Sequence, residues 1–408
     1  MLTSNDLNKD RYIILDHIRG LAVLMVLLFH WSKIFVDPAS VANLLHFSRI
    51  LENTDFGLLS KVSTFILSTS TSYWVFGVRF DSGGVLLFFL VSGFVIPMSL
   101  EKGGVVHFAL RRVFRLLPTL WTVIFLNLLL YLLLFDIGYI TVREYSFFHV
   151  IANMFLINDW FWFPSIDIGF WTLLVEVKFY FLIGCLYILT GKTNLLSVGG
   201  LATFLFLLSL PFQDFAGVSD YDYLLNFSAQ SGYDWVFYFY RVLNDASPFI
   251  IYMLIGTVIF LYYQKRVTLG AAIICCAVLY VFFATSFLIS PNGTYQIYYV
   301  SDGFKILVFF VLMLAVASYE CTSGRFYFLS IFLKYFGNIS YSLYLVHSFF
   351  GMSIIYCIWM LFGSVDLAFV LGSFLVITIT IFVNKFIEKP SISAGIWVCK
   401  FLKRRQYV

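Results

Sequence analysis

Long apolar stretches recur along the whole sequence, and they constrain the fold more than any other feature. A membrane-spanning helix needs about 20 apolar residues to cross roughly 30 Å of hydrocarbon. Of the 408 residues, 61% are hydrophobic and only 12% are charged, whereas a soluble domain of this size has about 25% charged residues. We therefore predict an all-α polytopic membrane protein.

Ten segments have the length and apolar character of a membrane-spanning helix. An eleventh segment, 147–163, is interrupted by Asn153, Asn158 and Asp159, and it could form either another span or a short helix in the membrane interface. The ten predicted spans are 13–35, 83–100, 115–136, 171–189, 195–211, 246–263, 268–289, 303–318, 335–361 and 366–386.

Basic residues favour ten spans over eleven. Lysine and arginine clusters precede the first span, follow the second, follow the spans that end at 263 and 318, and close the chain. Cytoplasmic loops are enriched in these residues. Ten spans place every cluster and both termini in the cytoplasm, whereas an eleventh would put some clusters on the wrong face. We expect a transmembrane domain over 1–390 and a basic cytoplasmic tail over 391–408.

The loop 212–245 then faces outward, and it is rich in aspartate and tyrosine. Tyrosines are enriched in the aromatic belt at a membrane surface, so these residues could belong to such a belt. An aromatic and polar loop could also stack on sugar rings.

Ionisable residues inside the spans identify candidate functional positions, because a charge in hydrocarbon is costly and usually faces a cavity or a partner. Arg19 and His30 are eleven positions apart, which places them on one helix face about 16 Å apart along the axis. Glu176, in the fourth span, lies at about the depth of His30 and could orient the imidazole or raise its basicity. The alternatives are an arginine reaching lipid phosphates, a hydrogen-bonded core histidine, and a carboxylate paired with Lys178 or Lys305.

Three arginines, Arg111, Arg112 and Arg115, cluster where the third span begins. Arg112 and Arg115 are three positions apart and therefore neighbours on one helix face. They could anchor the chain to lipid phosphates or bind a phosphorylated ligand through their two guanidinium groups. The spacing alone does not decide between these alternatives.

Two spans carry small or polar residues. Ser92 and Gly93 allow another helix to approach closely. Ser340, Tyr344 and His347 follow the i, i+4, i+7 rule and form one polar stripe, which favours a lined cavity.

The six cysteines lie mostly in apolar runs without a CxxC pair, so we interpret them as core residues and predict no metal site.

Six short motifs occur in order along the chain: Arg19-Gly20-x-Ala22 followed by His30, Gly84-x-x-x-Phe88-Phe89-x-x-Ser92-Gly93-Phe94, Arg112-x-x-Arg115, Trp171-x-Leu173-x-x-Glu176, Ser340-Tyr341-x-x-Tyr344-x-x-His347, and Glu388-Lys389-Pro390. Together they resemble the acyltransferase-3 family of bacterial membrane proteins, which O-acylate polysaccharides, lipids and related glycans. The resemblance covers essentially the full chain. Some members carry a C-terminal extracytoplasmic hydrolase-like domain; this sequence ends at Val408, so we expect that domain to be dispensable or supplied by another protein.

The resemblance implies about ten helices in a bacterial inner membrane and an acyl-coenzyme A co-substrate, usually acetyl-coenzyme A, with no tightly bound cofactor. It implies that His30 is the leading catalytic candidate, with Arg19 and Glu176 beside it. Arg112 and Arg115, with Arg111 next to them, would hold the donor phosphates. The remaining pocket-lining residues would be Ser92, Gly93, Ser340, Tyr341, Tyr344 and His347.

These expectations give one mechanism and two rivals. Coenzyme A would dock from the cytoplasm, and His30 would act as general base on an acceptor hydroxyl or carry the acyl group itself. The acceptor would be a cell-envelope glycan or lipid-linked sugar; lipids would be the other partners, nucleic acid would not, and a homo-oligomer is left open. The rivals are a proton-coupled secondary transporter, although no inverted repeat is evident, and a catalytically silent protein that recognises a glycan.

Overall fold

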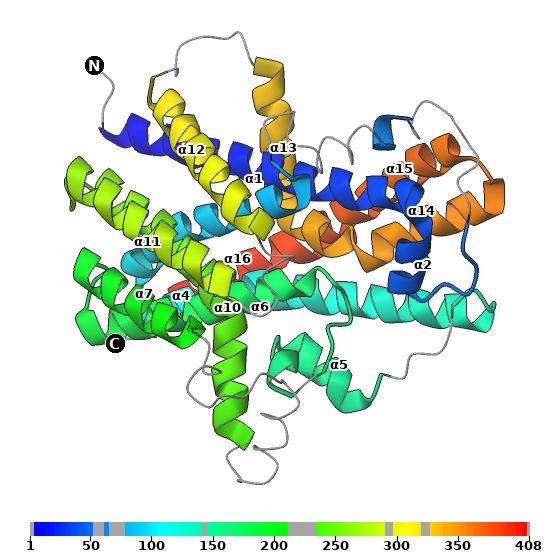
Figure 1. The fold of residues 1–408 in the computed structure, drawn as a ribbon, viewed down its shortest axis with the longest axis horizontal. Coiled ribbons are helices and arrows are strands. Elements are labelled where there is room, and N and C mark those ends of the chain that lie inside the picture. Colours follow the sequence, from blue (N-terminus) through cyan, green and yellow to red (C-terminus); the bar gives the residue numbers. More distant parts are fainter. Residues whose placement is uncertain are drawn as a thin grey trace.

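The computed structural model describes residues 4–51, 61–64, 78–140, 145–161, 163–210, 234–289, 297–319 and 327–405. Most of its helices run along the long axis of the molecule (Figure 1). The described residues form no β-strand, and their one isolated bridge joins Phe47 and Ile140. The prediction of an all-α protein is confirmed. Residues 212–233 of the predicted outward loop 212–245 lie outside the described residues.

Helices make up most of the described residues. Short 3-10 and π segments occupy Asn158–Phe161 and Asn384–Glu388. The α-helices are α1 (Ser4–Val36), α2 (Pro38–Leu45), α4 (Phe80–Asp136), α5 (Phe147–Met154), α6 (Phe170–Thr190), α7 (Leu195–Ser209), α10 (Asp234–Tyr263), α11 (Leu269–Ile289), α12 (Ile297–Tyr319), α13 (Tyr327–Val346), α14 (Phe349–Phe362), α15 (Val365–Val383) and α16 (Lys389–Arg405).

Seven described helices are long and apolar enough to cross a membrane, or eight if the bent pair α13–α14 is one span. All ten predicted ranges nevertheless fall on helices. The two counts differ partly because α4 counts once although its 57 residues would extend about 85 Å if straight. They also differ because α7, with 15 residues, is shorter than a usual span. The exact number of crossings stays a prediction.

Helix α4 is two arms joined at Gly104. This glycine has a φ of 71°, a left-handed conformation that residues with a Cβ rarely adopt. Figure 1 shows the chain folding back near this point, so that the second arm returns along the bundle toward the side from which the first arm came. The arms correspond to the predicted spans 83–100 and 115–136.

Two other predicted segments differ from a simple span. The eleventh candidate, 147–163, contains only the eight-residue α5 and a short 3-10 turn, so it forms no helix long enough to cross a bilayer. The predicted span 335–361 is not one helix, because it breaks at His347 and Ser348 and bends there by 74° between α13 and α14. Neither Gly nor Pro stands at this break, which is why the sequence did not indicate it.

Glycines allow α1 and α13 to touch backbone to backbone. A Cβ on Gly20 would lie 2.0 Å from the Leu333 carbonyl oxygen, and one on Gly337 would lie 2.1 Å from the Asp16 carbonyl oxygen. Real Cβ atoms do not approach so closely, so both positions require glycine. The contact brings the polar face of α1 against the polar stripe of α13.

The first arm of α4 makes a similar close contact with α10. A Cβ on Gly93 would lie 1.9 Å from the Met253 carbonyl oxygen, and one on Gly256 would lie 2.4 Å from the Leu90 carbonyl oxygen. The Thr257 hydroxyl donates to the Gly93 carbonyl at 2.9 Å. The predicted close approach at Ser92-Gly93 is therefore confirmed, and it fixes the first arm beside the cavity described below.

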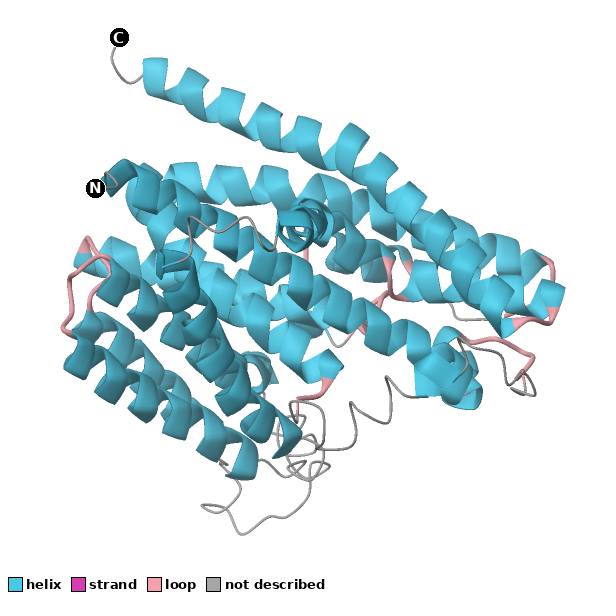
Figure 2. Cartoon of the chain, turned by 90° about the horizontal axis from the view of Figure 1, so that it is seen from above, coloured by secondary structure: helices cyan, strands magenta, loops and turns pink. Residues whose placement is uncertain are grey.

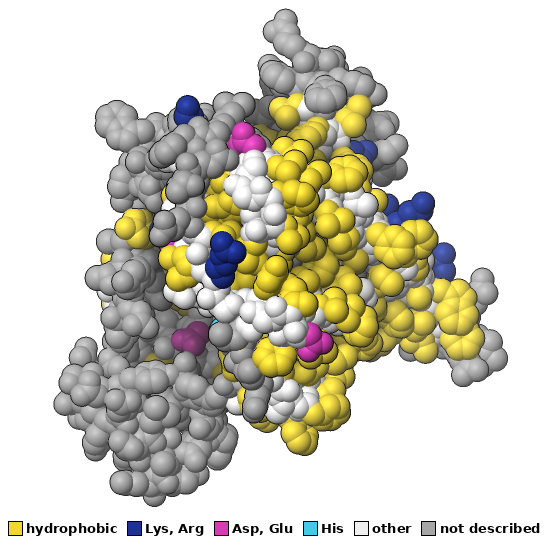
Figure 3. Space-filling view, turned by 90° about the vertical axis from the view of Figure 1, so that its right-hand side faces the viewer, with side chains coloured by type: hydrophobic (Ala, Val, Ile, Leu, Met, Phe, Trp, Pro, Cys, Tyr) yellow, Lys and Arg dark blue, Asp and Glu magenta, His cyan; other side chains and the backbone are white. Residues whose placement is uncertain are grey.

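The first turns of α1 and the last turns of α16 lie at the same end of the bundle (Figures 1 and 2). The predicted tail 391–408 is, over its described residues, a helix packed on α4, with Gly395 against Phe114 and Cys399 buried. At the opposite end, hydrophobic side chains prevail over a few charged ones on the visible described surface (Figure 3). An arrangement with both termini on one side agrees with an even number of spans, while their cytoplasmic location stays a prediction.

Candidate functional site

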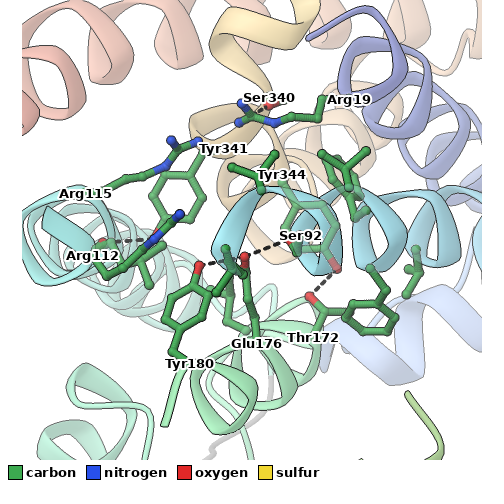
Figure 4. Close-up of a pocket in the computed structure, with 18 residues that line it drawn as sticks. Arg19, Ser92, Arg112, Arg115, Thr172, Glu176, Tyr180, Ser340, Tyr341 and Tyr344 are labelled. Carbon is green, nitrogen blue, oxygen red and sulfur yellow. Dashed lines mark hydrogen bonds between the residues drawn. The ribbon is translucent and has the colours of Figure 1, made fainter. Parts of the chain in front are cut away.

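A cavity lies where α1, both arms of α4, α6 and α13 meet, and it encloses about 790 Å³ counting its open mouth. Its apolar lining comes mainly from the first arm of α4, including Val85, Phe88 and Phe89. Its polar lining residues, drawn in Figure 4, are Arg19, Ser92, Arg112, Arg115, Thr172, Glu176, Tyr180, Ser340, Tyr341 and Tyr344. Most of the residues predicted to form a site are thus brought together.

Arg112 and Arg115 enter the cavity from the second arm of α4 (Figure 4). The Arg112 guanidinium stacks on the rings of Tyr180, at 5.1 Å from the ring centroid, and Phe108, at 5.3 Å. Among the described residues, no carboxylate lies within salt-bridge distance of either arginine. The aromatic faces stabilise the Arg112 cation only in part, so the two arginines leave positive charge available to an anionic ligand.

Arg19 enters from the opposite side of the cavity (Figure 4). Its guanidinium donates to the Ser340 hydroxyl at 3.0 Å and lies 3.5 Å from the Asp16 carboxylate. The close α1–α13 contact makes this hydrogen bond possible. Arg111, by contrast, is exposed and does not line the cavity. The prediction that Arg111 belongs with the other two arginines of its cluster is therefore not what the structure shows.

Glu176 has different partners from those the sequence suggested. Its carboxylate accepts hydrogen bonds from the Ser92 hydroxyl at 2.9 Å and from the Tyr180 hydroxyl at 2.6 Å. No hydrogen bond joins it to His30 among the described contacts, so the expectation that it orients the imidazole is wrong for this structure. The reason is local: Tyr180 follows Glu176 by four residues and occupies the same face of α6. The alternative partner Lys178 instead pairs with Asp159 at 2.5 Å.

His30 is joined to His347 and does not itself line the cavity. The two rings stack with centroids 5.2 Å apart, and His30 Nδ1 lies 3.0 Å from His347 Nε2. His347 is 1% exposed, whereas His30 is partly exposed. The Nδ1 of His347 lies 2.6 Å from the Tyr344 carbonyl oxygen, and the His347 carbonyl accepts from the Trp31 indole at 3.2 Å.

Tyr344 links the cavity to the histidine pair. Its ring contacts Phe88, with centroids 5.6 Å apart, and His347, with centroids 5.3 Å apart. Its hydroxyl accepts a hydrogen bond from Thr172 at 2.8 Å. Because Tyr344 lines the cavity and His347 does not, His347 lies behind the tyrosine ring. His347 and Gly93 were predicted as pocket-lining, and both lie just outside the lining.

Sequence reasoning missed three residues of this region. Tyr180 could have been found, since it is four positions from Glu176 on the same helix. Thr172 and Asp167 gave no signal, because their importance depends on α13 and on the break after it. Asp167 accepts hydrogen bonds from the Phe349 amide at 3.1 Å and from the Ser348 hydroxyl, immediately beside His347.

The fold and the site together define a multi-pass helical membrane protein with a cationic cavity between its helices. Residues 12–385 match the acyltransferase-3 family, whose description is an acyltransferase domain. The match covers nearly the whole chain, so the protein belongs to this family and the predicted resemblance is confirmed. Comparisons with curated proteins and with solved structures found no match.

Proposed function

We propose that this membrane acyltransferase moves an acetyl group from coenzyme A to a hydroxyl of a cell-envelope glycan or glycolipid in a bacterial inner membrane. The observation that carries the proposal is the composition of the cavity: three guanidinium groups and one carboxylate line it, and it ends at a tyrosine that contacts a histidine pair. This arrangement suits a donor with phosphates at one end and a reactive thioester at the other.

The arginines would bind the phosphates of the donor. Arginine cations within a membrane are costly without a counter-charge, and Arg112 and Arg115 have no carboxylate partner within salt-bridge distance in the described part of the chain. A phosphate supplies both the charge and the acceptor oxygens that guanidinium groups bind best. Glu176 would act through Tyr180, whose ring supports Arg112. Glu176 would therefore position the side chains that bind the donor and would not position the histidine.

His30 would be the base that activates the acceptor. It takes the proton of the acceptor hydroxyl, the oxygen attacks the thioester carbonyl carbon, and the carbon–sulfur bond breaks. The departing thiolate then takes the proton back from the imidazolium, so the products are an ester and coenzyme A. A polar cavity wall offers hydrogen bonds to the oxyanion that forms in between.

The test is transfer of labelled acetyl from acetyl-coenzyme A to envelope glycans in membranes that contain the wild-type protein or the His30→Gln variant. We expect the wild type to form an alkali-labile ester and the variant to lose about 10²- to 10⁴-fold in rate, the usual contribution of a general base. His17→Gln is the matched control, because His17 lies on the same helix and contacts Ser330 instead.

Two results would contradict the proposal. One is equal incorporation by the wild type and His30→Gln at equal abundance. The other is movement of label across sealed vesicles without ester formation, which is the behaviour of a transporter. Protection of both proteins against heating by coenzyme A shows that each is folded and binds donor.

A further inference from the structure

The hydrogen bonds of the histidine pair determine where its protons lie. The Tyr344 carbonyl oxygen can only accept a hydrogen bond, and it lies 2.6 Å from His347 Nδ1. His347 Nδ1 must therefore carry a proton. In a neutral imidazole the other nitrogen then has a lone pair and no proton, so Nε2 of His347 is an acceptor.

That acceptor fixes the tautomer of His30. His30 Nδ1 lies 3.0 Å from His347 Nε2, and because the latter can only accept, His30 Nδ1 must donate. Neutral His30 then carries its proton on Nδ1, and its Nε2 keeps a free lone pair. Nε2 is the nitrogen that makes no hydrogen bond to His347, so it is the one available to a substrate hydroxyl.

We propose that His347 is the positioning residue of the transfer reaction, and that it holds His30 in the tautomer whose Nε2 accepts the proton of the acceptor hydroxyl. The proposal rests on the proposed function of His30 as base. It assigns to a neutral histidine the task that a carboxylate has in many catalytic histidine sites. His347 touches neither donor nor acceptor in this scheme.

The surroundings of His347 are built to hold one ring orientation. It lies at the break between α13 and α14, where the backbone bends by 74°. On one side, the Trp31 indole of α1 donates to its carbonyl. On the other, Asp167 binds the next two residues through the Ser348 hydroxyl and the Phe349 amide. The backbone at the break is thus held from two sides, and this holds the His347 imidazole in one orientation.

A packing role alone does not explain this arrangement. His149 is also buried, and its Nε2 binds a single backbone carbonyl, that of Pro164. His347 uses both nitrogens, one on the backbone and one on a second imidazole. That second imidazole, His30, is partly exposed. The pair therefore connects a fixed backbone oxygen to a partly exposed ring.

The proton movement in the transfer leaves His347 unchanged. His30 Nε2 accepts the hydroxyl proton as the alkoxide attacks the thioester carbonyl, and it returns the proton to the coenzyme A thiolate after the carbon–sulfur bond breaks. Throughout, the Nδ1–H of His30 stays donated to His347 Nε2. A hydrogen bond to a neutral acceptor stabilises the imidazolium that forms in between.

The test combines kinetics with histidine NMR on the full chain in detergent micelles. His347→Ala is expected to lower kcat by about 10- to 100-fold, the usual loss when a partner that orients a functional histidine is removed, with the KM for acetyl-coenzyme A unchanged. His347→Gln is expected to recover part of kcat, because its side-chain oxygen can accept from His30 Nδ1. His17→Gln serves as the control and is expected to keep the wild-type kcat.

The NMR measurement is independent of turnover. The ¹⁵N and ¹³C shifts of labelled wild-type protein, assigned with His30→Gln, are expected to show His30 as the Nδ1–H tautomer. An Nε2–H tautomer in the wild type, or a wild-type kcat in His347→Ala, would overturn the proposal. If the wild type transfers no acetyl group, the proposed function fails, and the histidine-pair assignment is still decided by the shifts.

Discussion

Removal of either cavity arginine should weaken binding of the donor, whereas removal of the neighbouring Arg111 should not. Arg112→Gln and Arg115→Gln each delete a guanidinium that lines the cavity, whereas Arg111→Gln deletes one that is exposed and outside it. The three positions lie close together on the same helix. Arg111→Gln is therefore a matched control for charge, side-chain length and position along the helix.

The size of the effect follows from the hydrogen bonds to phosphate that each substitution would remove. A hydrogen bond to a charged partner contributes about 1.5–3 kcal/mol, which corresponds to a factor of about 10 to 150 in the dissociation constant. Arg112→Gln also removes the stacking of the guanidinium on Tyr180 and Phe108. We expect the single variants to weaken coenzyme A binding by that factor, and the double variant to weaken it further.

The assay should separate phosphate recognition from recognition of the rest of the donor. Calorimetry in nanodiscs with coenzyme A and with acetyl-pantetheine, which has no nucleotide phosphates, gives that separation. We expect the arginine variants to lose affinity for coenzyme A and to bind acetyl-pantetheine as the wild type does. The affinity of the wild type for coenzyme A should also fall as salt is raised, because phosphate recognition of this kind is electrostatic.

The reasoning would be refuted if Arg111→Gln weakened coenzyme A binding as much as Arg112→Gln and Arg115→Gln. It would also be refuted if both cavity variants bound coenzyme A with the wild-type affinity. In the first case, the arginines would act as a diffuse positive surface. In the second, the cavity would not be the phosphate site.

Two further predictions concern the scaffold. Burial raises the pKa of Asp167 although its carboxyl group accepts four hydrogen bonds. The contribution of Asp167 to the stability of the folded protein is therefore full below the unfolded pKa of about 3.9, and it is lost as pH rises through the native pKa. We expect the difference in Tm between wild type and Asp167→Asn to shrink with rising pH in a thermal series, and a difference that grows would contradict this. Gly337→Ala places a methyl 2.1 Å from the Asp16 carbonyl oxygen and should cost about 1–3 kcal/mol, whereas Gly184→Ala, with no atom within 4 Å, should be neutral or slightly stabilising. Equal Tm values for the two variants would show that α1 and α13 can separate without cost.

The sequence predicted helices and their faces better than the contacts between them. The spacing predicted that Arg19 and His30 share one face of α1, and in the structure they bind Ser340 and His347, which lie on α13 and just after it. It did not predict Ser340 and His347 as their partners, because pairing depends on the register between two helices. That register is set by Gly20 and Gly337, which meet backbone atoms of the opposite helix. A glycine pattern in one sequence does not identify the helix it will contact.

The expected role of Glu176 failed for a similar reason. Depth along the membrane normal was inferred from the position of each residue within its span, and it set Glu176 level with His30. Depth says nothing about rotation of α6 about its own axis. In the structure, that rotation turns Glu176 toward Ser92 and Tyr180. The carboxylate is consequently on the arginine side of Tyr344, and the histidine pair is on the other.

On the proposed function, this separation would let one helix take part in both donor binding and proton transfer. Arg19 and His30 stand about 16 Å apart on α1; Arg19 binds Ser340 of α13, and His30 binds His347 at the break after α13. Strong positive charge near His30 would oppose formation of an imidazolium, whereas the phosphates of a donor require that charge. The Tyr344 ring contacts Phe88 of the cavity lining and the His347 ring, so it lies at the boundary of the two regions. On the proposed function, a donor that binds both regions would be extended, anionic at one end and uncharged at its reactive end, and acyl-coenzyme A has this shape.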